Sequence, residues 1–267
     1  MNKRVKDKIA ISGATGFVGR NLTKYFDRHN TKYTSITRTS FKTEHTQILS
    51  KCFCFIHLIG TGSENSETSF QRVNVELTKK AIDICKKSKI KKIIYFSGLG
   101  VSKDSTSKYF ISKFESEQII INSGLDYTIF RPSYIIGKDD YLTINIQKQI
   151  KQKKILIPGS GEYIIQPISI DDVCKIIHFA SESKLVCKKI IDLVGPQKLT
   201  FKQFLKNSIS NSNVNIEKVP VSKAYHYALS DQKFAYGIED LNILLGNFQG
   251  DYAVSYTHLT LPTNREV

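Results

Sequence analysis

Three glycines near the N-terminus have a spacing that could let a backbone turn bind a phosphate group. The run SGATGFVGR (12–20) lies between an apolar segment and a segment with helical periodicity. Glycine has no Cβ, so backbone N–H groups of such a turn can approach a diphosphate, and the following helix N-terminus adds positive partial charge. The sequence therefore predicts a dinucleotide-binding turn. We expect its contacts to come from Gly13, Thr15, Gly16, Phe17, Val18 and Gly19.

A tyrosine and a lysine four residues apart could carry acid–base chemistry. In YFISK, Tyr109 and Lys113 would lie on one face of a helix. A phenol with a pKa near ~10 exchanges protons poorly at neutral pH unless a cation stabilises its phenolate. Lys113 could supply that cation, so Tyr109 is a candidate proton donor. The alternative, a packed Tyr109 with Lys113 in solvent, stays open.

The end of the second expected strand bears on which dinucleotide is bound. An acidic residue there would bind the ribose 2′-OH of NAD(H), whereas a basic residue would bind the 2′-phosphate of NADP(H). The sequence has Arg38 and Lys42 there and no acidic residue before Glu44. We therefore expect Arg38 to bind the cofactor and NADP(H) to be preferred over NAD(H). An ordinary surface arginine is the alternative.

Strands and helices must alternate to bring these residues together. Apolar patterns of period 2 and period 3.6 take turns over the first two-thirds of the chain, which is typical of a doubly wound parallel sheet, the Rossmann-type α/β fold. We expect a dinucleotide-binding domain over residues 1–133 and a small C-terminal α/β substrate lobe, interleaved with the sheet edge, over 134–253. Strands are expected at 8–13, 33–38, 53–60, 91–98, 126–133, 155–159, 163–168 and 188–195, and helices at 16–29, 69–87, 109–124, 141–152, 171–183 and 200–209.

Two segments depart from this pattern. Residues 39–51 are too few for the usual helix, strand and helix, so we expect a reduced or missing edge strand and one short helix over 43–51. VSYTHLTLPT (254–263) resembles the translation of a sequencing adapter. We therefore expect residues 254–267 to be non-native and the natural chain to continue past about Ala253, with a genuine β-rich segment as the alternative.

Composition limits the partners and the compartment. The net charge is +15, but the densest basic runs, 86–92 and 148–154, end helical patterns and lack interleaved aromatic residues, so we expect solvated faces and no nucleic-acid partner. The five cysteines show no metal-ligand spacing, so we expect reduced thiols and no metal site. No apolar run reaches ~18 residues and no signal peptide is apparent, so we expect a cytoplasmic protein without a transmembrane segment. Peripheral membrane or complex association and the oligomeric state stay open.

Together these motifs resemble the short-chain dehydrogenase/reductase superfamily, in its extended and atypical, epimerase/dehydratase-like branches. The resemblance covers about residues 8–250 and rests on GATGFVG, HLIG (57–60), Asn74, YFISK, FRPSYIIG (130–137) and QPISIDDV (166–173). The run from YFISKFESEQ onward is most similar to the atypical group that contains the NADPH-binding accessory subunit of respiratory complex I and its prokaryotic relatives. The resemblance implies acid–base catalysis by Tyr109 and a nicotinamide ribose held by Lys113. It adds cofactor contacts from Leu58, Ile59, Gly60 and Pro132.

One departure bears on activity. Extended enzymes of this superfamily usually have two hydroxyl residues where this chain has Ser97 and Gly98, and the second polarises the substrate carbonyl. Successive strand residues face opposite ways, so Ser97 is a candidate catalytic residue but no simple substitute, and Ser102 or Ser105 could serve instead. The intact Tyr109 and Lys113 favour an NADP(H)-dependent oxidoreductase or epimerase acting on a small carbonyl or hydroxyl substrate. Gly98 favours a non-catalytic NADPH-binding structural or redox-sensing protein, and a sugar-nucleotide epimerase or dehydratase is a third reading.

Overall fold

The computed structural model describes residues 7–37, 46–209, 214–230 and 234–252. Its centre is a six-stranded sheet in the order β10-β5-β4-β3-β1-β2, and every neighbouring pair is parallel. This arrangement confirms the doubly wound, Rossmann-like α/β fold predicted from the alternating periodicities. The sheet strands are β1 (Lys8–Ser12), β2 (Tyr33–Ile36), β3 (Cys52–His57), β4 (Lys92–Phe96), β5 (Asp126–Pro132) and β10 (Lys189–Leu193).

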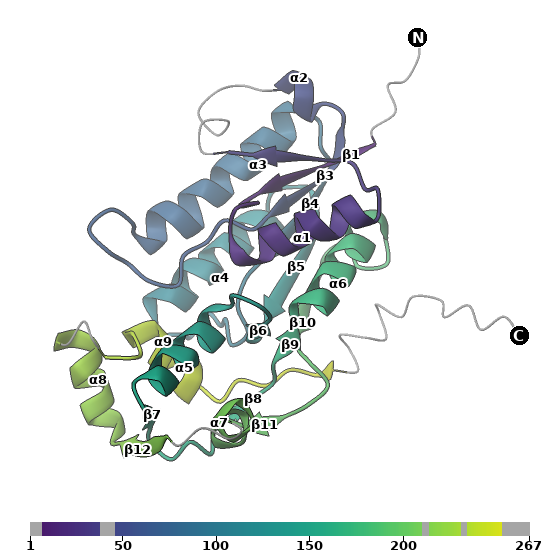
Figure 1. Ribbon diagram of the computed structural model, residues 1–267. Coiled ribbons are helices and arrows are strands. Elements are labelled where there is room, and N and C mark those ends of the chain that lie inside the picture. The colour runs from purple at the N-terminus through teal and green to yellow at the C-terminus, as the bar shows by residue number, and fades with distance from the viewer. Residues whose placement is uncertain (1–6, 38–45, 210–213, 231–233, 253–267) are drawn as a thin grey trace, which may run out of the picture.

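Helices cover both faces of the sheet (Figure 1). On one face, α1 (Phe17–Arg28) and α6 (Ile170–Glu182) bury an apolar stripe against side chains such as Ile9 and Ile56. On the other face, α3 (Leu77–Lys87) and α4 (Lys108–Ile121) pack on the alternate side chains of the same strands. Successive side chains of a strand point to opposite faces, so strands buried on both sides have nearly continuous apolar sequences.

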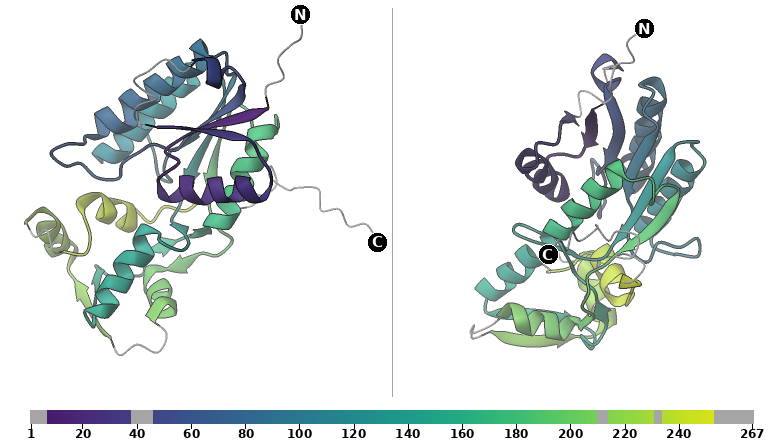
Figure 2. Two further views of the ribbon diagram at one scale, coloured as in Figure 1. Left: turned by 45° about the horizontal axis from the view of Figure 1, so that its top comes forward. Right: turned by 90° about the vertical axis from the view of Figure 1, so that its right-hand side faces the viewer.

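A second lobe lies beyond the carboxyl ends of the sheet strands (Figure 2). Its apolar core is separate from the two cores that flank the sheet, and it contains three two-stranded pairs, β11-β8, β12-β7 and β6-β9. Its elements are β6 (Ile135–Ile136), α5 (Tyr141–Lys151), β7 (Lys154–Pro158), β8 (Ile164–Ile165), β9 (Ile168–Ser169), β11 (Leu199–Thr200), α7 (Phe201–Ile209), β12 (Asn215–Val219), α8 (Val221–Ser230) and α9 (Ile238–Leu245). The sequence did not predict β6, β11, β12, α8 or α9.

Two predicted strands have different bounds. The strand expected over 53–60 ends at His57, because Leu58 to Gly60 turn toward the glycine loop. The strand expected over 163–168 is two short strands, since β8 pairs with β11 and β9 pairs with β6. The change of partner falls at Pro167, which has no N–H to continue a ladder.

The short connection between β2 and β3 is described only in part. Residues 46–49 form the helix α2 (Thr46–Leu49), within the predicted helix, and β2 is the outermost strand of the described sheet. Residues 38–45 lie outside the described chain, as does the predicted adapter-like tail, 254–267. None of the described helices has the length and apolar character needed to cross a bilayer.

Candidate functional site

The glycine loop packs against backbone on two sides. Gly13 has φ +78°, and a Cβ there would lie 2.9 Å from the carbonyl carbon of Leu58. A Cβ at Gly19 would collide with the Gly13 carbonyl oxygen and lie 2.6 Å from Cα of Ala14. Glycine is required at both positions, because any side chain would push the loop away from β3 or from α1.

The loop presents the N-terminus of α1. Gly16 is its N-cap and supplies no capping side chain, and the first turn contains no acidic residue. Thr15 and Gly16 are exposed, and the Thr15 carbonyl is occupied by Nη1 of Arg20 at 2.9 Å. The first N–H groups of α1 and the positive end of its dipole are thus available to an anion. The loop fits a dinucleotide diphosphate.

The end of β3 is held between this loop and α4. The N–H of Leu58 donates to the Ser12 carbonyl at 3.1 Å, and the Ser12 hydroxyl lies 2.7 Å from Nδ1 of His57. Burial, together with the nearby Lys113 ammonium, lowers the pKa of His57 to about 3, so the imidazole is neutral. A Cβ at Gly60 would lie 2.9 Å from Nζ of Lys113, which brings this turn against the proposed catalytic lysine.

Asn74 ties the turn after β3 to α4. It lies in η1 (Gln71–Glu76), a π-helical turn that leads into α3, and it is fully buried. Its Oδ1 accepts the Thr61 N–H at 2.9 Å, and its Nδ2 donates to the Ser112 hydroxyl at 2.9 Å. π-Helical turns are rare and frequent at functional sites. The sequence singled out Asn74 only as a family match and not as a site residue.

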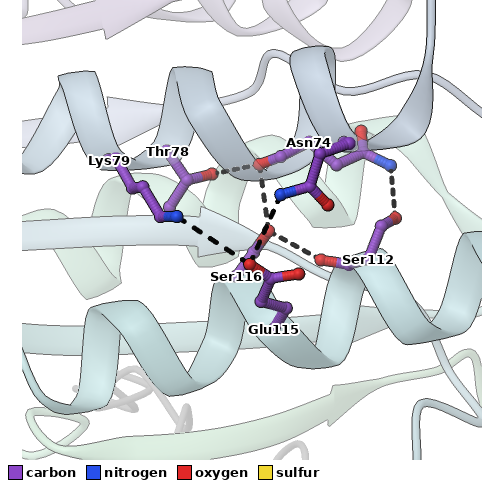
Figure 3. Close-up of polar contacts among 7 residues, drawn as sticks. Asn74, Thr78, Lys79, Ser112, Glu115 and Ser116 are labelled. Atoms are coloured by element: carbon purple, nitrogen blue, oxygen red, sulfur yellow. Dashed lines mark hydrogen bonds and ion pairs between the residues drawn. The ribbon is translucent and has the colours of Figure 1, made fainter.

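The carbonyl of Asn74 is also a backbone acceptor for two side chains. The carbonyl oxygen of Asn74 accepts the Thr78 hydroxyl at 2.6 Å and the Ser116 hydroxyl at 2.9 Å, as Figure 3 shows. Both hydroxyls and the carbonyl are buried. These bonds fix η1 against the helix that carries Tyr109 and Lys113.

Tyr109 and Lys113 lie together at the start of α4, and Nζ of Lys113 is 6.0 Å from the Tyr109 ring centroid. Lys113 is 5% exposed, and its ammonium donates to the Phe96 carbonyl at 2.9 Å. Burial raises the pKa of Tyr109, and the Lys113 charge opposes that rise. Burial also lowers the pKa of Lys113. The phenol is therefore protonated at neutral pH and can act as a proton donor.

The phenol lies directly over Gly98. A Cβ at Gly98 would be 3.1 Å from Oη of Tyr109, closer than an undisturbed contact allows. The neighbouring Ser97 is 4% exposed, and its Oγ has no hydrogen-bond partner in the described part of the chain. Because residue 98 is glycine, two hydroxyls lie at the end of β4: that of Tyr109, and that of Ser97, which has no partner among the described residues.

A cavity of about 310 Å³ opens between the sheet and the second lobe. Its walls come from the ends of β4 and β5, the starts of α1, α4 and α5, the strand β8, and α9 with the residues that follow it. Four of the predicted site residues line it: Phe17, Ser97, Tyr109 and Pro132. Tyr134, Asp240 and Phe248 also line it and were not predicted as site residues. Tyr134 lies within the FRPSYIIG motif, whereas Asp240 and Phe248 come from parts of the lobe that carry no motif.

The other predicted residues are not among the described residues of the cavity wall, but several of them lie against one another. Gly13 contacts Leu58 and Ile59, and Gly60 contacts Lys113. Arg38 lies outside the described residues, so the basis for NADP(H) preference remains the sequence. Ser102 and Ser105 accept backbone N–H groups at 3.2 and 3.3 Å in their own loop and are not among the described residues of the cavity wall.

Comparison with known families agrees with this geometry. The NAD dependent epimerase/dehydratase family matches residues 9–192, more than half of the chain. The chain belongs to this family. The match runs from β1 to β10 and so includes the glycine loop, Tyr109 and Lys113.

Named relatives are subunits of respiratory enzymes. The chain is 28% identical over 181 residues to "NADH dehydrogenase [ubiquinone] 1 alpha subcomplex subunit 9, mitochondrial" of Dictyostelium discoideum, which covers 66% of this chain and 49% of that protein. The protein of the same name from Arabidopsis thaliana is 29% identical over 157 residues, covering 57% of this chain and 39% of its own length. The chain spans about half or less of the length of these relatives. They bear out the predicted similarity to the complex I subunit.

Solved structures share the fold. UDP-glucuronic acid 4-epimerase from Bacillus cereus, in complex with UDP-glucuronic acid and NAD, has a TM-score of 0.67 at 18% identity and covers 93% of this chain and 95% of its own. UDP-N-acetylglucosamine 4-epimerase from Methanobrevibacter ruminantium, in complex with UDP-N-acetylmuramic acid, has a TM-score of 0.66 at 17% identity, with 81% and 86% covered. At these identities the likeness concerns the fold alone.

Proposed function

We propose that the protein is an NADP(H)-dependent oxidoreductase that interconverts a carbonyl and a hydroxyl group on a small molecule. The observation that carries the proposal is the Tyr109 hydroxyl in the cavity wall, with the Lys113 ammonium buried beside it. The bound dinucleotide would supply a hydride. Family membership and the glycine loop support such a cofactor.

In this proposal Tyr109 supplies the proton that balances the hydride. Reduction adds the hydride to the carbonyl carbon and the Tyr109 proton to the carbonyl oxygen, which leaves an alcohol and a phenolate. Lys113 would stabilise that phenolate, because its charge lowers the pKa of Tyr109 against the effect of burial. Ser97 Oγ, buried and without a partner among the described residues, is available to the same substrate oxygen.

NADP(H) is the dinucleotide that the sequence favours. In the sequence, basic Arg38 follows β2 by two residues and suits a 2′-phosphate, and no acidic residue stands between it and Glu44. The Bacillus cereus structure contains NAD, which concerns that protein and leaves the preference of this one to be measured. If Arg38→Ala leaves the ratio of NADPH to NADH affinity unchanged, the assignment of Arg38 is wrong.

A second candidate is an NADPH-binding protein without turnover. Gly98 favours it, because the carbonyl-polarising hydroxyl expected at that position is absent. The names of the two relatives also describe subunits of a larger enzyme. Complex association is therefore part of this candidate. The cytoplasmic location and the absence of a nucleic-acid partner stay predictions.

Two measurements separate these candidates. Calorimetric titration with NADPH and NADH tests the cofactor site, and the near-ultraviolet absorbance of the reduced nicotinamide follows turnover with a panel of carbonyl compounds. Tyr109→Phe should abolish turnover and keep NADPH binding. The matched control is Tyr127→Phe, because Tyr127 lies at the start of β5 and the cavity lies at its end; this variant should keep both turnover and NADPH binding. NADPH binding without any Tyr109-dependent oxidation would favour the non-catalytic candidate.

A further inference from the structure

The cavity beside Tyr109 contains no positive side chain in its described wall: none of the described residues that line it is lysine, arginine or histidine. A nucleoside diphosphate sugar carries two negative charges at its diphosphate. Moving such charges out of water without a paired cation is strongly unfavourable. The side chains of this wall therefore offer a diphosphate no compensation.

Helix N-termini could replace a cation, and four helices begin at the cavity. The N-terminus of α1 is assigned to the dinucleotide, that of α4 is capped by the Ser107 hydroxyl, and those of α5 and α9 already hold carboxylates. Asp140 caps α5, accepting the Thr143 N–H at 2.8 Å and the Gly137 N–H at 3.1 Å. At α9, Asp240 accepts the Gly237 N–H at 2.8 Å. These carboxylates satisfy the free N–H groups and repel an incoming anion.

Three other polar side chains of the wall, those of Tyr141, Asn145 and Tyr236, are bonded to the protein itself. The Tyr236 hydroxyl donates to the Leu156 carbonyl at 2.9 Å. The Asn145 amide donates to the Ala235 carbonyl and accepts Nε2 of Gln149 at 3.2 Å.

Four neutral hydroxyls of the wall remain without a hydrogen-bond partner among the described residues. They belong to Ser97, Tyr109, Ser133 and Tyr134. Burial raises the pKa of Tyr134 as well as that of Tyr109, so both phenols stay uncharged at neutral pH. Apolar side chains, among them Ile164, Ile243 and Phe248, also line the cavity.

We propose that this cavity binds a neutral, largely apolar carbonyl compound and excludes nucleoside diphosphate sugars, an inference that rests on the proposed oxidoreductase function. The carbonyl oxygen lies among the free hydroxyls near Tyr109, and the apolar body extends toward β8 and α9. The volume of about 310 Å³ is at the lower end of the ~300–1,000 Å³ of small-molecule pockets, which suits a compact ligand.

Binding to the protein saturated with NADP+ tests the substrate class without turnover. The probes are 2-decanone and trans-cinnamaldehyde as neutral carbonyl compounds, UDP-glucose as a diphosphate sugar, and decylamine as a cation of similar length. Calorimetry or saturation-transfer NMR should give an affinity for the neutral compounds at least about tenfold above that for UDP-glucose and decylamine. Equal or tighter binding of UDP-glucose or of decylamine would overturn the inference.

Variants locate the bound probe. Ile243→Glu places a charge in the apolar part of the cavity wall and should weaken 2-decanone binding at least about tenfold. The control Leu229→Glu, on α8 with a side chain 73% exposed, should leave binding unchanged. If Ile243→Glu does not fold, Ile164→Glu, which is half-buried in the same wall, gives the same test. Unchanged binding in a folded cavity variant would contradict the location.

The two proposals fail in different ways. Loss of the proposed function would appear as no dinucleotide binding or no Tyr109-dependent turnover, whatever the cavity binds. Loss of the present inference would appear as a functional dinucleotide site whose cavity prefers UDP-glucose or the amine. The binding assay does not depend on turnover, so both results can be read from one protein preparation.

Discussion

The Ser107 hydroxyl donates a hydrogen bond to Oε2 of Glu239 at 2.6 Å, and this bond joins the two lobes. Ser107 is the N-cap of α4, the helix that begins with Lys108 and Tyr109, and its hydroxyl also accepts the Phe110 N–H at 3.4 Å. Glu239 lies in the first turn of α9. The Ser107 hydroxyl therefore fixes the start of α4, the helix that carries Tyr109, and also the contact between α4 and α9.

Removing this hydroxyl should loosen both connections. Ser107→Ala is expected to lower the free energy of unfolding by about 1 kcal/mol, the usual cost of losing an N-cap. Urea unfolding of Ser107→Ala, Glu239→Gln and the double variant gives a coupling energy, for which we expect about 0.5–1.5 kcal/mol. A coupling energy near zero would mean that the hydrogen bond between the lobes contributes nothing to stability.

Gly98 is expected to be required for the position of the Tyr109 phenol. A methyl group at residue 98 would lie 3.1 Å from Oη of Tyr109, so the phenol must shift by a few tenths of an ångström. Misplacing a reacting group lowers rates steeply, so Gly98→Ala should reduce kcat about tenfold with little change in NADPH affinity. The matched control is Gly62→Ala, because a Cβ at Gly62 meets no atom within 4 Å. Undiminished turnover in Gly98→Ala would show that the phenol tolerates the shift.

The parts of the site that depend on local spacing could be predicted from the sequence. The glycine loop follows from three glycines between a strand and a helix, and Tyr109 and Lys113 share a helix face because they are four residues apart. The alternation of period 2 and period 3.6 also predicted the central sheet. In each case the information lies within a few consecutive residues.

The parts that depend on packing between distant segments could not be predicted. β12 has a single buried residue, Val219 at its end, so its sequence shows no alternation of apolar and polar residues. The π-helical turn at Asn74 lies inside a continuous helical pattern and is fixed by partners such as Ser116, from another helix. Glu239 meets Ser107 across 132 positions of sequence, which no local pattern encodes.

The buried imidazole of His57 predicts an acid-sensitive fold. Its pKa is about 3 in the folded protein against 6.5 for the free side chain, so the unfolded chain binds a proton more readily. The stabilisation is complete above about pH 6.5 and is lost as the pH falls toward 3, at up to about 1.4 kcal/mol per pH unit.

Chemical denaturation at a series of pH values measures this dependence. His57→Asn keeps a polar partner for the Ser12 hydroxyl, which lies 2.7 Å from Nδ1 of His57, and should flatten the slope between pH 6.5 and 4. His226→Asn, at an exposed histidine of α8, is the control and should keep the slope of the unaltered protein. The same slope in all three proteins would exclude His57 as its source.

Gly19 should be indispensable for dinucleotide binding. A Cβ there would collide with the Gly13 carbonyl oxygen and approach Cα of Ala14 to 2.6 Å, and both are backbone atoms that cannot rotate away. Gly19→Ala must therefore separate the loop from α1, which moves the N–H groups away from the diphosphate. We expect at least about a tenfold loss of NADPH affinity and a destabilisation of about 1–3 kcal/mol, the usual cost of overpacking. Gly62→Ala should change neither quantity, and a Gly19→Ala protein that binds NADPH normally would place the diphosphate elsewhere.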